Sequence, residues 1–442
     1  YTKKAIKRLQ QNQNDFESVA SYLGILIDRL ASFNNTLIRW ANHRETAIPP
    51  FSNTGFPMTW DYAEINPIGN STGNWASSIG WVTRVIESNS FNSLDSNVIQ
   101  ASAASLPIDN NKLNAVITDP PYYDAVPYSD LSDFFYVWLK RTLGDVHNDV
   151  FRTPLTPKAQ EIVSHLNRSY PGKYKAPEDY EVGMRKAFKE AKRVLFSNGI
   201  AAVMFAHKST SAWEKIINGI LSSGLIITSS WPFYTELTNR VRGLGSAALA
   251  SSVTLICRKR TEDASEGFWD DVRQDLREVA NERLDFFWDQ GIRGADFFIS
   301  AIGPALSVFG KYEKVVRLSG EEVTVGQFLE EVRSVVTEYA LNKIIKQSGR
   351  GQIDPETRFY VVWKWSYGDA KVPADEAFTL AKALGLDTEI MWDKTGTLEK
   401  SGQNVQALPI GKRMAISNLG EPEGDAKPAS AVSYTHLTLP TN

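Results

Sequence analysis

Apolar residues near the start of the chain follow a helical period. They recur every three or four positions: Tyr22, Leu26, Leu30 and Phe33. This spacing places them on one side of a helix, so residues 1–45 are predicted to be helical. A stretch rich in Asn, Pro and Gly follows, and a second helix is predicted over residues 75–88. The sequence therefore predicts a mostly helical N-terminal segment over residues 1–90.

From residue 97, short apolar runs of strand length alternate with helical patterns. The runs are NVIQASA (97–103), NAVIT (114–118), GIAAVMFAH (199–207), LIITSSWPF (225–233) and ASSVTLICRK (250–259). Helical faces are formed by Leu131, Phe134, Phe135, Trp138 and Leu139, by Tyr180, Met184, Phe188, Ala191 and Leu195, and within residues 213–221. Ser129 or Asp130 is the expected N-cap of the first of these helices. This alternation predicts an α/β fold with a largely parallel sheet and helices on both faces. The link between the last two runs is short for a crossover, so a hairpin or a functional loop stays open there.

The rest of the chain is predicted to form a helical region over residues 263–350 and a small mixed α/β module over residues 351–431. In that module RFYVVWKW (358–365) is predicted to be a strand, with its aromatic residues in a core rather than on a nucleic-acid surface. Residues 432–442 look like translated adapter sequence and are left outside the fold. Because the chain starts at Tyr1 inside a helical pattern, it is interpreted as part of a longer protein.

Composition excludes several classes of protein. Of the 442 residues 42% are hydrophobic, which suits a globular fold, and the net charge of -3 gives no overall basic field for nucleic acid. The single cysteine, Cys257, excludes a disulfide framework and a multi-cysteine zinc site within this chain, and the five histidines lack the spacing of metal ligands. No apolar run reaches the ~20 residues of a membrane span. A cytoplasmic protein without a bound metal or membrane contact is therefore expected.

The strongest chemical signal is the sequence NAVITDPPYYD (114–124). Its apolar run ends on Asp119, at the position where ligands bind in an open α/β sheet. Proline fixes φ and removes an N–H, so Pro120 and Pro121 stiffen a segment that offers a carboxylate and main-chain carbonyls as acceptors. Tyr122 adds a flat aromatic face. Acceptors beside a stacking platform suit the exocyclic amino group of a planar base.

An amino group on an aromatic ring needs such acceptors before it can attack a methyl donor. Its lone pair is delocalised into the ring, and two acceptors on its hydrogens can localise that pair on the nitrogen. A base in a duplex must first leave the stack, which costs a few kcal/mol, and stacking on an aromatic side chain can return about 1–3 kcal/mol.

Three longer stretches carry a family resemblance: TDPPYYDAVPYSDLSDFFYVWLKR, WPFYTELTNRVRGLGSAALASSVTLICRKR and GIRGADFFISAIGPAL. With the DPPY motif they resemble the large prokaryotic adenine-specific DNA methylases described as containing a zinc ribbon, over most of residues 15–420. The resemblance implies an N6-adenine methyltransferase that uses S-adenosyl-L-methionine on double-stranded DNA, with a Rossmann-like core over residues 91–262. It implies that Asp119 and the Pro120 carbonyl accept from the adenine amine and that Tyr122 stacks on the flipped base.

The resemblance also suggests cofactor and nucleic-acid contacts. It places the cofactor at the end of the run 97–103, where the chain offers Ser102 and Ala103, and a simple turn stays open there. The glycine-rich cofactor loop of such enzymes is not recognised; GLGS (243–246) is a weak candidate, and the loop is expected in an upstream part of a longer protein. Candidate nucleic-acid contacts are Tyr123, Arg240 and Arg242, although a solvated loop explains the two arginines equally well. N4-cytosine or RNA methylation and a non-catalytic nucleic-acid-binding subunit stay open, and defence-system proteins are expected partners.

Overall fold

The computed structural model describes most of the chain: residues 15–42, 45–52, 58–89, 96–123, 126–170, 173–206, 210–233, 252–261, 263–292, 294–348, 355–384, 386, 397–402 and 404–408. The chain divides into two compact units. Unit 1 comprises Tyr1–Gln100 and Tyr123–Tyr180, and unit 2 comprises Ala101–Tyr122 and Glu181–Asn442. Each unit is therefore built from two separate stretches of sequence.

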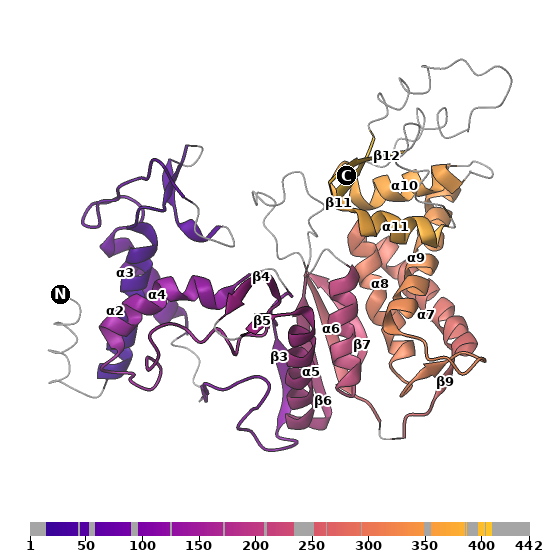
Figure 1. The fold of residues 1–442 in the computed structure, drawn as a ribbon, viewed down its shortest axis with the longest axis horizontal. Helices are drawn as coiled ribbons and strands as arrows, with labels where there is room; N and C mark the ends of the chain where they lie inside the picture. Colours follow the sequence, from indigo (N-terminus) through magenta and orange to yellow (C-terminus); the bar gives the residue numbers. More distant parts are fainter. Residues whose placement is uncertain are drawn as a thin grey trace, which may run out of the picture. The chain divides into compact units, whose positions relative to one another are not determined.

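Unit 1 is built around the helices α2 (Phe16–Phe33), α3 (Trp75–Asn89) and α4 (Tyr128–Leu143) (Figure 1). Its short elements are β1 (Arg39–Ala41), β2 (Thr46–Ile48), the 3-10 turn η1 (Pro50–Ser52), β4 (His165–Tyr170) and β5 (Lys173–Lys175). β1 pairs antiparallel with β2, and β4 pairs antiparallel with β5. The predicted helices at residues 75–88 and 131–139 are confirmed in position, whereas the helical prediction for residues 1–45 holds only for α2, because residues 39–41 form β1 and residues 1–14 lie outside the described residues.

Helices α2 and α4 pack closely where α2 has small residues. A Cβ atom on Gly24 would lie 2.6 Å from Leu143 of α4, so glycine permits this approach. Ala20, Tyr136, Leu143 and Phe151 form the small core beside it. The predicted contact face of α2 is therefore partly wrong: Leu26 is buried, but Tyr22 is 41% exposed because Ala20 and Gly24 make the close contact.

Unit 2 contains the central sheet, in the order β3-β6-β8-β7. The strands are β3 (Leu113–Thr118), β6 (Leu195–Phe205), β7 (Leu225–Phe233) and β8 (Ser252–Lys259). β3 and β6 are parallel, whereas β8 runs antiparallel to both of its neighbours, β6 and β7. The sheet is mixed, so the prediction of an α/β fold is confirmed while β8 departs from a parallel arrangement. The antiparallel pairing of β7 and β8 is the one that the hairpin alternative predicted.

Helices cover the sheet unevenly. Helices α5 (Pro177–Val194) and α6 (Thr210–Ser222) pack together, with Gly219 beside Phe188, and Trp213 of α6 contacts Phe205 of β6. Helix α8 (Gly294–Phe309) packs along β7, where the Ser230 hydroxyl donates to the Ser300 carbonyl at 2.9 Å and accepts from the Gly303 N–H at 3.2 Å. At the other end of the sheet, Ile117 of β3 is 76% exposed. The prediction of strands covered on both faces is therefore wrong for β3.

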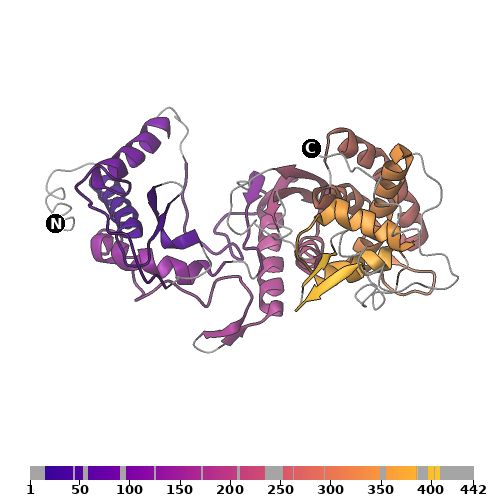
Figure 2. The same ribbon diagram turned by 90° about the horizontal axis from the view of Figure 1, so that it is seen from above.

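The remaining elements of unit 2 are helices and short strands that follow the sheet in the sequence, drawn from brown to yellow in Figure 2. They are α7 (Trp269–Asp289), α9 (Val325–Ser348), α10 (Pro355–Tyr367) and α11 (Ala374–Ala383), with the short strands β9 (Gly267–Phe268), β10 (Val315–Val316), β11 (Val372–Pro373), β12 (Leu398–Ser401) and β13 (Asn404–Ala407). The predicted strand at residues 358–365 is wrong, because this segment lies in α10. Its aromatic residues Phe359, Tyr360 and Trp363 are buried, as the core interpretation predicted. No helix in the described ranges has both the length and the apolar character needed to cross a bilayer.

Candidate functional site

The DPPY segment lies at the carboxyl ends of the parallel strands β3 and β6. β3 ends at Thr118, so Asp119 is the first residue beyond it, and its side chain is exposed. Pro120 is buried and Pro121 is partly buried, which anchors the backbone directly behind the carboxylate. Because proline fixes φ, this short segment presents Asp119 in a defined direction. The sequence prediction of an acidic residue at a strand end is confirmed.

The side chain of Tyr122 contacts Asp119, three residues earlier in the DPPY segment. The Tyr122 hydroxyl donates a hydrogen bond to Asp119 Oδ1 at 2.6 Å. Among the residues that the structure describes, Asp119 forms no ion pair, so its carboxylate is not neutralised by a neighbouring cation there. An exposed carboxylate beside a partly buried aromatic ring can accept an N–H from a planar ligand and offer that ligand a surface to stack on.

Two aromatic residues that the sequence reasoning missed extend from Tyr122: Phe205 contacts Tyr122, and Trp213 contacts Phe205. Thr118 of β3 pairs with Val203 of β6, so the parallel register carries Phe205 to the same edge as the DPPY segment. The ring of Tyr122 lies 5.4 Å from that of Phe205 at an angle of 79°, and the ring of Phe205 lies 5.0 Å from that of Trp213 at 89°. Phe205 is 0% exposed and Trp213 is 3% exposed. In the sequence, Phe205 lies near the end of the run 199–207 and Trp213 lies in the first turn of the next helix. These positions could have indicated that both residues lie near the site.

Ser102 and Ala103 lie in an exposed turn and not at the end of a strand. The predicted strand over residues 97–103 is absent, since Val98 is 91% exposed and no neighbouring strand pairs with this run in the part described. The Ser105 N–H donates to the Ser102 carbonyl at 2.9 Å, and the Ala104 N–H donates to Ser102 Oγ at 3.2 Å. The simple turn left open by the sequence is therefore what the structure has, and cofactor binding by these residues stays a prediction.

The chain after this turn is fixed to the end of α5. Glu190 Oε2 accepts from the Leu106 N–H at 2.9 Å, and Arg193 donates to the carbonyls of Leu106 at 2.9 Å and Ile108 at 2.7 Å. Hydrogen bonds from Arg193, and then from the Leu106 backbone, lower the pKa of Glu190 to about 2. Helix α5 ends at Val194, directly before β6 begins. These contacts therefore hold residues 106–108 beside the start of β6, at the opposite end of the strands from Asp119.

Tyr123 follows the DPPY segment in an unusual backbone conformation. Its φ is 56°, in the left-handed region that residues other than glycine seldom adopt. Its carbonyl accepts from the Ser164 N–H at 3.0 Å, and its ring lies 5.2 Å from that of Tyr180 at an angle of 89°. Burial raises the pKa of Tyr180, against the opposing effect of a hydrogen bond with the Tyr123 backbone. The partly buried side chain of Tyr123 thus packs against Tyr180 of unit 1, and a nucleic-acid contact for it stays a prediction.

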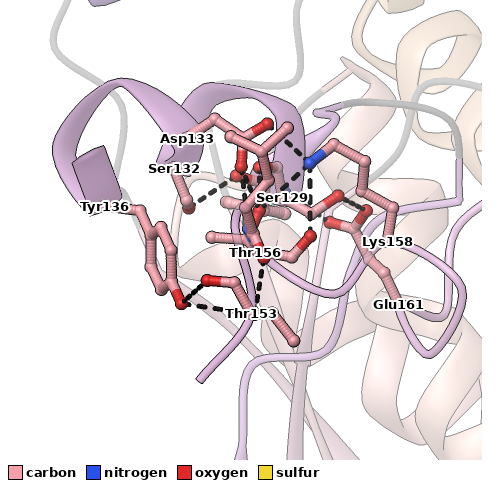
Figure 3. Close-up of polar contacts among 10 residues, drawn as sticks. Ser129, Ser132, Asp133, Tyr136, Thr153, Thr156, Lys158 and Glu161 are labelled. Carbon is pink, nitrogen blue, oxygen red and sulfur yellow. Dashed lines mark hydrogen bonds and ion pairs between the residues drawn. The ribbon is translucent and has the colours of Figure 1, made fainter. Parts of the chain in front are cut away.

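The segment that ends at Ser164 is held on α4 by a polar network (Figure 3). Asp133 Oδ1 accepts from the Thr156 N–H at 2.9 Å and from the Thr156 hydroxyl at 2.6 Å, while Asp133 Oδ2 accepts from Lys158 Nζ at 2.5 Å. Burial acts to raise the pKa of Asp133, but the hydrogen bonds from Lys158 and Thr156 outweigh it and lower that pKa. We call the interactions of Asp133, Thr156 and Lys158 the α4 network.

A second carboxylate completes the attachment at the start of α4. Glu161 accepts from the Ser129 N–H at 2.9 Å and from the Ser129 hydroxyl at 2.5 Å. Helix α4 begins at Tyr128 after Pro127, so neither Ser129 nor Asp130 is its N-cap and that prediction is wrong. Glu161, which is distant in the sequence, instead accepts from an N–H of the first turn that has no acceptor within the helix. Its negative charge also interacts favourably with the positive end of the helix dipole.

The other predicted site residues contribute less to the described structure. Arg240, Arg242 and the GLGS motif (243–246) lie outside the described residues. Within the described ranges no group of three or more His, Cys, Asp or Glu side chains could hold a metal ion. Cys257 is buried in β8, and burial raises the pKa of its thiol to about 12, so it is not a nucleophile at neutral pH.

The structure thus brings together two predicted groups, Asp119 and Tyr122, and adds Phe205 and Trp213 to them. It leaves Ser102 and Ala103 in a separate turn, which is held by hydrogen bonds within residues 102–105. No protein-family model matches the sequence, and neither a curated protein nor a solved structure matches it closely enough to indicate a relative.

Proposed function

We propose that this chain binds an extruded nucleobase at the DPPY segment and serves N6-adenine methylation of double-stranded DNA with S-adenosyl-L-methionine as the methyl donor. One observation carries the proposal: Asp119 is exposed at the carboxyl end of β3, with the ring and hydroxyl of Tyr122 directly beside it. In this proposal the sheet of unit 2 belongs to a Rossmann-like methyltransferase core. Double-stranded DNA, and proteins of a defence system, are the proposed partners.

The residues of the chain would act on the amino group by position and electrostatics. Asp119 accepts one amino hydrogen, and the carbonyl of Pro120 is the proposed second acceptor. Positive charge develops on the nitrogen as it attacks, and a carboxylate aimed at that nitrogen stabilises the charge. Tyr122 supplies the ring against which the base stacks, and this stacking is worth about 1–3 kcal/mol.

The described residues do not form a recognisable cradle for the methyl donor. Ser102 and Ala103 are in an exposed turn. The chain directly after this turn is bound to Glu190 through the Leu106 N–H, at the opposite end of the strands from Asp119. The proposal therefore assigns residues to the base alone and derives no step through the cofactor. When bound, the cofactor supplies an electrophilic methyl group.

The test is methyl transfer from radiolabelled S-adenosylmethionine to unmethylated double-stranded DNA, with the modified nucleosides separated by mass spectrometry. Asp119→Ala should lower the rate at least ~100-fold, as expected when a group stabilising transition-state charge is removed. Asp263→Ala, which removes an exposed carboxylate elsewhere in unit 2, should leave the rate unchanged. An Asp119→Ala protein that methylates at the normal rate would exclude Asp119 as the amine acceptor. N4-methylcytosine as the product would favour the cytosine alternative, and a product formed only on RNA would favour the RNA alternative.

The second candidate is a nucleic-acid-binding subunit without catalysis, and the missing cofactor cradle in the described part favours it. Calorimetry separates the two. A chain that binds S-adenosylmethionine supports the enzyme, whereas a chain that binds adenosine but no cofactor supports the binding subunit.

A further inference from the structure

We propose that the Tyr122 hydroxyl is an internal substitute for the substrate amino group at Asp119 Oδ1, so that a base whose amino group uses this oxygen must displace it. The inference rests on the proposed base-binding function and adds a second role for Tyr122, as a residue that selects ligands by their N–H groups. It concerns unit 2 alone, in which Asp119, Tyr122, Phe205 and Trp213 all lie.

The geometry of the hydrogen bond supports this substitution. The donor is a hydroxyl on an aromatic ring, and it meets a carboxylate oxygen at 2.6 Å, within the usual range for an O–H donor to an ionised acceptor. An exocyclic amino group is also a donor attached directly to an aromatic ring. The Tyr122 hydroxyl therefore donates a hydrogen bond to the same carboxylate to which the amino group of the proposed substrate would donate.

The aromatic residues behind Tyr122 hold its ring in this position. Phe205 meets the Tyr122 ring at 79°, close to the edge-to-face arrangement that aromatic pairs prefer. Phe205 is itself fixed because it is buried at the end of β6 and packs against Trp213 of α6. A ring supported in this way keeps its hydroxyl near Asp119, so the hydrogen bond reforms whenever the acceptor is vacated.

This arrangement makes the site selective. A ligand without an amino hydrogen gains nothing at Asp119 and leaves the Tyr122 hydroxyl in place. A primary amine replaces that hydrogen bond with its own, and a base with one added methyl group retains one N–H fewer for the acceptors. Tyr122 therefore competes more effectively with the methylated base than with the unmodified one, which favours release of the product.

The experiment compares adenosine with N6,N6-dimethyladenosine, which has no N–H on that nitrogen, by ligand-observed NMR titration of the full chain. Tyr122→Phe keeps the ring and removes the competing hydroxyl. Because a single hydrogen bond contributes about 0.5–1.5 kcal/mol net, Tyr122→Phe should bind adenosine roughly 2- to 12-fold more tightly. The affinity for N6,N6-dimethyladenosine should not change.

Asp119→Ala provides the matched background. With the acceptor removed, Tyr122→Phe should no longer alter the affinity for adenosine, and this double-mutant cycle isolates the contribution that acts through Asp119. Equal or weaker adenosine binding by Tyr122→Phe would overturn the inference while leaving the base-binding site intact. If neither protein binds adenosine, the proposed base-binding function fails and the inference fails with it.

Discussion

The α4 network gives the sharpest prediction about the stability of unit 1. Asp133→Asn keeps the shape of the side chain and one oxygen, which can still accept from Thr156, but it removes the charge that pairs with Lys158. The side chains of Lys158 and Asp133 are 19% and 21% exposed, so the lost interaction is largely shielded from water. The substitution should therefore loosen the segment from Thr153 to Ser164, whose far end supports the Tyr123 carbonyl.

The magnitude follows from the charge and burial of the pair. A hydrogen bond to a charged group contributes about 1.5–3 kcal/mol, and the lower half of that range applies here because the pair is only partly buried. We therefore expect a loss of ~1.5–2 kcal/mol in the free energy of unfolding at pH 7. The hydrogen bonds that lower the pKa of Asp133 stabilise its ionised form in the folded state. Their contribution is therefore present above the pKa of the unfolded chain and is lost as the pH falls through the folded-state pKa.

The assay combines urea denaturation with hydrogen exchange. The Thr156 amide donates directly to Asp133, so its exchange should accelerate in Asp133→Asn. Asp149→Asn is the control: it makes the same change of charge in the same connecting segment, but Asp149 and Arg152 are 90% and 71% exposed and such a pair is worth at most about 1 kcal/mol. If Asp133→Asn costs no more stability at pH 7 than Asp149→Asn, the α4 network does not hold this segment and the reasoning is refuted.

Three further predictions concern other buried groups. Burial raises the pKa of Asp28 to about 7, and its Oδ1 has no hydrogen-bond partner among the described residues, so stability should fall as the pH rises from about 4 to 7. Asp28→Asn should remove that fall and gain roughly 1 kcal/mol at pH 8 after allowance for partial exposure, as measured by urea denaturation at pH 4.5 and 8. Gly303→Ala should lower the melting temperature, at a cost of about 1–3 kcal/mol, because its Cβ would clash with Ser230, whereas Gly80→Ala in α3 has open space and should slightly raise it. Cys257 should resist maleimide labelling at pH 8 in the folded protein and react in urea; rapid labelling without urea would contradict its burial.

Local periodicity was sufficient to predict helices with one apolar face. Tyr180, Met184 and Phe188 were placed on one side of a helix by their spacing, and all three are at most 3% exposed in α5. Local periodicity was insufficient for residues 358–365, where apolar residues occur on several sides. Phe359 and Trp363, four residues apart, stack at 5.6 Å within α10, which shows a helical period that the aromatic and β-branched composition of this segment obscured.

Strand prediction failed for a run that has no partner strand among the described residues. Residues 97–103 have the composition of a strand, but a strand is stable only when its backbone groups are paired, and the run is exposed in the structure. For the candidate site, Asp119 was predictable because it lies next to its strand in the sequence. The contact of Tyr122 with Phe205 was not, because it depends on the pairing of β3 with β6 across the intervening sequence.

The pairing of β3 with β6 has a consequence for how the protein is made. About 75 residues, including α4 and α5, separate the two strands in the chain. At a synthesis rate of ~5–20 residues per second, β3 leaves the ribosome roughly 4–15 seconds before its partner exists. The exposed edge of a nascent strand is open to mispairing during that interval. We therefore expect the yield of folded protein to depend on translation speed and chaperone supply, with Leu113–Thr118 as the segment most in need of protection until β6 emerges.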